Sequence, residues 1–140
     1  MKVVFDANVF VSGLSRRNFS APTILMDMWK RGTFEVVVSQ HILTKIEEAW
    51  RKPYFRTFLT NEEIAFILAE VSALAGFVTP ADDVHGVAED DEDDLVLATA
   101  VAANADYLVT GDKYLLRIGE FRGTPIVSPR EFLDLMLPPE

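Results

Sequence analysis

Residues 3–12 read VVFDANVFVS, an apolar run interrupted by one acidic residue. Val3, Val4 and Phe5 are β-branched or aromatic, and such a run predicts a short buried strand that ends at Asp6. Residues 105–113 read ADYLVTGDK and repeat the pattern, with a strand over 107–110 and a turn that carries Asp112. Each of these two expected strands is therefore followed by an aspartate at its carboxyl end.

The rest of the chain alternates helical and extended patterns. Further strands are expected at 34–38, 77–79 and 124–127. Helices are expected at about 21–31, from 39 to just before Pro53, over 61–76, over 95–103 and from 129 onward, while residues 81–92 read as a polar loop. Capping boxes at 60–63 and 128–131 support the starts of two of these helices. Strands separated by helices favour an α/β fold whose parallel sheet is covered on both faces.

The composition narrows the class of protein. A length of 140 residues with 49% apolar and 11% aromatic side chains is enough for one core, so we expect a single domain over 1–140. The absence of cysteine excludes disulfides and thiolate metal sites and favours a reducing cytoplasm. An early charge at Lys2 and the lack of an apolar run of roughly 20 residues argue against a signal peptide or a membrane helix.

The negative charge of the chain is concentrated in one place. The net charge is −9, and the window from 82 to 94 holds eight acids and no Lys or Arg. A uniformly acidic surface would disfavour a nucleic-acid partner, because phosphate binding draws on basic side chains. A local cluster of carboxylates instead favours binding of a counter-cation.

Candidate catalytic residues follow from the topology. Ligands of open parallel sheets sit beyond the carboxyl ends of the strands, where Asp6 and Asp112 are expected. The acids of 89–94 open the helix that leads into the second of these strands. Carboxylates are the ligands that Mg²⁺ and Mn²⁺ prefer, and such ions serve phosphodiester cleavage. Each acid also has an ordinary structural interpretation, as an acceptor for turn amides or as a helix N-cap.

The stretches 3–12 and 105–113, the acid-led alanine-rich helix before the second, and residues 128–133 resemble the PIN-domain family. The likeness spans nearly the whole chain and is greatest to a bacterial and archaeal branch of toxin–antitoxin components. It implies a three-layer α/β/α fold with a central parallel sheet of about five strands. It further implies a Mg²⁺- or Mn²⁺-dependent ribonuclease that acts on RNA, pairs with an antitoxin protein and forms a homodimer.

The resemblance also assigns residues. The first family aspartate falls on Asp6 and the last on Asp112, while the aspartate at the start of the buried helix falls on Asp93 or Asp94. Both alternatives stay open. Positions that line or brace the acidic pocket in similar proteins fall on Asn8, Ser12, Asp90 and Thr110.

One family position departs from the pattern, because the glutamate on the second helix falls on Lys45. Glu48 lies one turn further along and is expected on the same flank as Lys45, whereas Glu47 points away. We therefore expect Glu48 to replace the missing acid in part. Basic side chains expected to contact RNA phosphates are Arg16, Arg17 and Lys113.

Two rival functions compete with the nuclease. A PIN fold weakened by Lys45 would bind RNA or a protein partner without cutting. A haloacid-dehalogenase-like phosphatase would also place an aspartate after a first strand, but it needs a second acid two residues later, where this chain has Asn8. Metal-dependent RNA cleavage that is lost in Asp6→Asn separates the nuclease from both.

Overall fold

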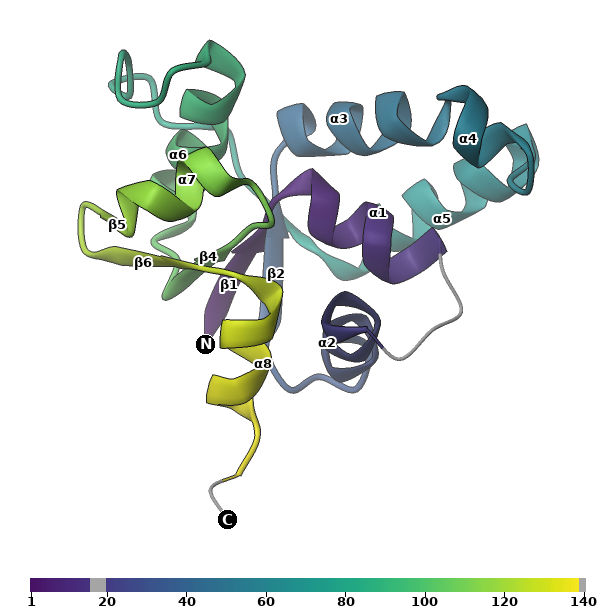
Figure 1. Cartoon of the computed structure of the whole chain (residues 1–140), viewed down its shortest axis with the longest axis horizontal. Coiled ribbons are helices and arrows are strands. Elements are labelled where there is room, and N and C mark those ends of the chain that lie inside the picture. The colour runs from purple at the N-terminus through teal and green to yellow at the C-terminus, as the bar shows by residue number, and fades with distance from the viewer. Residues whose placement is uncertain (16–19, 139–140) are drawn as a thin grey trace.

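The computed structural model describes residues 1–15 and 20–138 (Figure 1). Within these residues the strands form a six-stranded sheet in the order β3-β2-β1-β4-β6-β5. All neighbours pair in parallel except β5, which is antiparallel to β6. The strands are β1 (Lys2–Phe5), β2 (Glu35–Val38), β3 (Gly76–Phe77), β4 (Tyr107–Val109), β5 (Glu120–Phe121) and β6 (Thr124–Val127).

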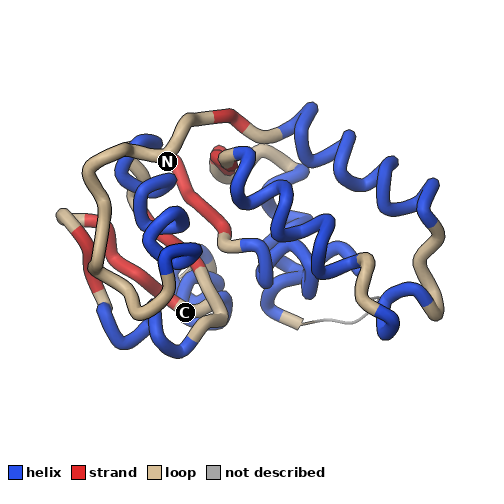
Figure 2. The backbone as a smooth tube through the Cα atoms, turned by 90° about the horizontal axis from the view of Figure 1, so that it is seen from above, coloured by secondary structure: helices blue, strands red, loops and turns tan. Residues whose placement is uncertain are grey.

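Helices lie on both sides of the strands (Figure 2), and the expected three-layer α/β/α fold with a mostly parallel sheet is confirmed. Helix α6 packs on β1 and β4, whereas α1 packs on α2 and α3. None of the described helices is long and apolar enough to cross a membrane. The helices are α1 (Ala7–Ser15), α2 (Ala21–Lys30), α3 (Gln40–Trp50), α4 (Pro53–Arg56), α5 (Asn61–Leu74), α6 (Asp91–Ala103), α7 (Lys113–Ile118) and α8 (Pro129–Met136).

Strand β1 is the centre of the core, as its sequence predicts. Val3, Val4 and Phe5 are fully buried. The ring of Phe5 makes edge-to-face contacts with Phe10 and Phe34, at centroid distances of 5.7 Å in both cases. A central strand covered on both faces needs apolar side chains on both faces, which explains the unbroken apolar run. The position of β1 fixes where Asp6 leaves the sheet.

Helix α1 was not expected from the sequence, which predicted no helix before about residue 21. Its buried Val9, Phe10 and Val11 gave no helix signal, because β-branched and aromatic residues have modest helix propensity. The helix packs tightly on α2: a Cβ at Gly13 would lie 2.5 Å from the Met26 side chain. Tertiary packing therefore outweighs local preference here.

The starts and ends of the other helices and strands agree with the sequence predictions in some places and differ in others. Both capping boxes are present, at Thr60 with Glu63 and at Ser128 with Glu131, so those two predictions are confirmed. The polar loop is shorter than expected, since α6 begins at Asp91 with Asp90 as its N-cap. The short elements α4 and β5 had no clear sequence signal. The expected strand at 77–79 occurs at 76–77 instead, because α5 ends earlier.

Candidate active site

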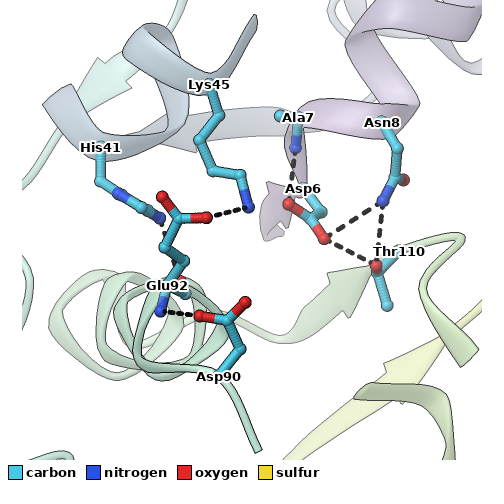
Figure 3. A network of polar contacts seen from close by, with 8 residues as sticks. All are labelled: Asp6, Ala7, Asn8, His41, Lys45, Asp90, Glu92 and Thr110. Carbon is cyan, nitrogen blue, oxygen red and sulfur yellow. Dashed lines mark hydrogen bonds and ion pairs between the residues drawn. The ribbon is translucent and has the colours of Figure 1, made fainter. Parts of the chain in front are cut away.

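Asp6 is the first residue after β1, and it is buried, with only 4% of its surface exposed. Its Oδ1 accepts a hydrogen bond of 2.7 Å from the Ala7 amide at the start of α1. Its Oδ2 accepts one of 2.8 Å from the hydroxyl of Thr110, the residue after β4 (Figure 3). Because a buried carboxylate is costly unless it is hydrogen-bonded, these donors explain why Asp6 can stay there.

Asn8 and Thr110 link the segments of the chain that follow β1 and β4. The Asn8 amide nitrogen donates to Asp6 Oδ2 at 3.2 Å, and its Oδ1 accepts from the Gly111 amide at 2.9 Å. Thr110 Oγ1 also accepts from the Asp112 amide at 3.0 Å. The two parallel strands are neighbours in the sheet, so their carboxyl ends meet here and the network fixes Asp112 relative to Asp6.

Asp112 serves as the N-cap of α7, where its Oδ1 accepts from the Tyr114 amide at 3.1 Å. Asp93, in the first turn of α6, faces it from the other side. The pKa of Asp93 is raised to about 6, first by burial and then by the charge of Asp112, a hydrogen bond with Asp112 and the charge of Asp6, while Lys45 acts in the opposite direction. Asp93 therefore faces Asp112, and the negative charges of Asp112 and Asp6 both act on it.

These carboxylates open onto one cleft. The cleft has a volume of about 290 Å³ and joins the carboxyl ends of β1 and β4 to the faces of α3 and α6. Residues 6–8 and Val11 contribute from the first strand and helix. Its remaining lining is Lys45, Ala49, Asp93 and Asp112.

Asp94 lies differently from its neighbour. Its carboxylate is 4% exposed and accepts hydrogen bonds from three successive amides, those of Gly86, Val87 and Ala88, at 2.9, 3.2 and 2.7 Å. Asp94 therefore ties the loop before α6 to the helix, and the cleft is lined by Asp93 instead. Asp90 caps α6 through the Glu92 amide at 2.9 Å.

On α3, Lys45 and Ala49 line the cleft, whereas Glu48 is exposed and is not part of the lining. The Lys45 ammonium lies 3.8 Å from a Glu92 carboxylate oxygen. The His41 ring nitrogen lies 3.0 Å from the Glu92 carbonyl oxygen, a second link between α3 and the start of α6 (Figure 3). Lys45 stood out in the sequence as a departure from the family pattern; its direct access to the cleft follows only from the fold.

The remaining sequence candidates surround the cleft or fall outside the described residues. Ser12 lines an adjoining hollow together with Asn8, Gly111 and Asp112. Lys113 is exposed beside Asp112. Arg16 and Arg17 lie outside the residues that the structure describes. The exposed Tyr114, which no motif indicated, lines a second hollow that also contains Asp93.

Comparison with known sequences decides the family. A sequence model described as "PIN domain" matches residues 2–114, a range that includes Asp6, Asp93 and Asp112. The chain belongs to the PIN-domain family. PIN domains are generally nucleases, so the acidic cleft lies in a domain whose family members are generally hydrolases.

One relative in sequence and one solved structure extend the comparison of this PIN domain. An uncharacterised protein of Methanocaldococcus jannaschii is 30% identical over 143 residues, which cover 96% of this chain and 90% of that protein. The crystal structure of VapBC2 from Rickettsia felis bound to a DNA fragment from its promoter matches with a TM-score of 0.63. That match has 16% identity and covers 91% of this chain and 98% of the other, so it shows the shared fold.

The donor set of the PIN cleft fits a hard divalent cation. Three carboxylates line it, and burial together with the charges of Asp112 and Asp6 raises the pKa of Asp93, so a positive ion in the cleft would favour its ionised form. Within the described residues, no three His, Cys, Asp or Glu side chains already stand together as a ready-made metal site. Mg²⁺ commonly keeps several waters and uses one or two carboxylates plus substrate phosphates.

Proposed function

We propose that this PIN domain is a Mg²⁺- or Mn²⁺-dependent ribonuclease that hydrolyses RNA phosphodiester bonds at the acidic cleft. The observation that carries the proposal is the convergence of Asp6, Asp93 and Asp112 from three elements on one cleft. Hydrolysis at phosphorus is favoured by positive charge near the phosphate, which carboxylates do not supply, and a bound metal ion also makes its water a better nucleophile. A carboxylate cleft in a nuclease fold is therefore best explained as a cation site.

In this proposal Asp6, Asp93 and Asp112 hold the cation. When bound, the ion supplies a Lewis acid and a more acidic water. Asn8 and Thr110 keep the Asp6 carboxylate oriented, because each donates to its Oδ2. Asp94 acts indirectly, by fixing the loop in front of α6, and Asp90 by capping that helix. Protonation of Asp93 competes with cation binding, since a carboxylate must be ionised to coordinate metal.

The proposed partners follow the same reasoning. RNA is the proposed substrate, with Lys113, Arg16 and Arg17 as candidate phosphate contacts. The Rickettsia felis relative was crystallised as a VapBC2 complex, which supports the proposal that this chain is the toxin of a pair and binds an antitoxin protein. A homodimer and a cytoplasmic location, the latter consistent with a cysteine-free chain, are further parts of the proposal.

A catalytically weakened binding module is the second candidate. It is favoured by one observation, the presence of the Lys45 side chain in the cleft, at a position where the family resemblance implies a glutamate. In such a protein the acidic cleft would bind RNA or a partner without turnover.

A cleavage assay separates these candidates. Mixed RNAs and a matched DNA are incubated with wild type and with Asp6→Asn, in Mg²⁺, in Mn²⁺ and in EDTA. The nuclease proposal predicts RNA products only for wild type with metal. RNA binding without products in any metal would favour the binding module. Phosphate release from a small ester without RNA cleavage would point to a phosphatase.

A further inference from the structure

Lys45 brings a fixed positive charge into the acidic cleft. Its side chain is 26% exposed and extends from α3 toward the space between the Glu92 and Asp6 carboxylates (Figure 3). Of the described residues that line the cleft, it is the one basic side chain.

The ion pair that positions the Lys45 ammonium is weak. Its ion pair with Glu92 is long, at 3.8 Å, and the Glu92 side chain is 58% exposed. Exposed pairs of this kind contribute little energy, so Glu92 does not hold Lys45 firmly in one geometry.

The positive charge of Lys45 changes the net charge of the cleft and therefore the number of metal ions that the cleft can hold. The three cleft carboxylates carry three negative charges, and Lys45 reduces the formal charge of the cleft to −2. One divalent cation neutralises that charge. A glutamate at position 45 would bring the formal charge to −4, which two divalent cations neutralise. A like charge a few ångströms from a second cation would strongly disfavour its binding.

We propose that Lys45 takes the place of a second metal ion, so that the cleft binds a single divalent cation. The inference rests on the proposed function only in taking the cleft as a cation site. Lys45 is then a positioning residue that sets the number and the affinity of the ions. Replacing it with a neutral side chain tightens binding of the one ion, and replacing it with an acid creates a second site.

Manganese binding to the RNA-free protein tests the proposal. Calorimetric titration with Mn²⁺ should give one ion for wild type, one ion bound at least about tenfold more tightly for Lys45→Met, and two ions for Lys45→Glu. Lys2→Glu is the matched control, because it makes the same charge change at the exposed start of β1, at the other end of the strand from Asp6. It should bind one ion with wild-type affinity.

Other outcomes overturn the proposal. Two ions in wild type would overturn it, as would no ion in wild type or identical titrations of wild type, Lys45→Met and Lys45→Glu. If Lys45→Glu fails to fold, as judged by circular dichroism, the affinity change in Lys45→Met decides. A wild type that binds one Mn²⁺ without cleaving RNA would refute the ribonuclease function while leaving the single-ion inference standing.

Discussion

The hydroxyl of Thr110 is the most sensitive point of the network around Asp6. Thr110 is fully buried, donates to Asp6 Oδ2 at 2.8 Å and accepts from the Asp112 amide at 3.0 Å. Thr110→Val keeps the shape of the side chain and removes both bonds, together with the long 3.5 Å hydrogen bond that the Asn8 amide nitrogen donates to Thr110 Oγ1. A hydrogen bond to a charged group contributes about 1.5–3 kcal/mol, and a neutral one about 1 kcal/mol. Asp6 keeps its Ala7 and Asn8 donors, so the expected loss is about 2–3 kcal/mol.

Urea unfolding in EDTA measures this loss as a lower midpoint at an unchanged slope. Thr110→Ser is the matched control: it retains the hydroxyl and removes one buried methyl, at a cost of about 1 kcal/mol. The reasoning would be refuted if Thr110→Val were as stable as Thr110→Ser, because the hydroxyl would then contribute nothing beyond packing.

Three further predictions concern acids inside and outside the cleft. The pKa of Asp93 is raised from 3.8 to about 6 in the folded protein, so the ionisation of Asp93 lowers the stability of the fold as the pH rises through that range. In EDTA, the unfolding free energy of Asp93→Asn should therefore equal that of wild type near pH 4 and exceed it above pH 6. Equal unfolding free energies at all pH values would contradict this prediction. Asp94→Asn weakens the hydrogen bonds that the backbone amides of 86–88 donate to the Asp94 carboxylate, so hydrogen exchange of these amides should accelerate at least about tenfold. Unchanged protection would show that the carboxylate does not hold the loop. Because Glu48 is exposed and outside the cleft lining, Glu48→Gln and Glu47→Gln should each change RNA cleavage less than about twofold; a severalfold loss in Glu48→Gln alone would support its role as a substitute acid.

Strand β1 and the two capping boxes could be predicted because local chemistry decides them. Val3, Val4 and Phe5 are apolar on both faces, and the Thr60 hydroxyl bonds an amide three residues away. The site at the carboxyl ends of β1 and β4 follows from parallel topology, which the alternation of elements indicates. Helix α1 could not be predicted in the same way, because the packing of Phe10 on Phe5 and Trp29 determines its conformation.

The direction of side chains on helices was the second feature that the sequence could not predict. Adjacent helical residues point about 100° apart, and α6 is apolar nearly all round, so the sequence does not tell Asp93 from Asp94. The loop amides of 86–88 make that distinction. On α3, the fully buried row includes Trp50, which turns Ala49 rather than Glu48 toward the cleft beside Lys45.

The central claim is that Asp93 and Asp112 take part in metal-dependent RNA cleavage. The single-turnover cleavage rate of one labelled RNA in Mn²⁺ tests it most directly, measured for wild type, Asp93→Asn, Asp112→Asn and the exposed control Asp91→Asn. Loss of a cation ligand should lower the rate by on the order of 100-fold or more in the first two variants, and Asp91→Asn should stay within about twofold of wild type. Equal rates in all four folded proteins would contradict the claim.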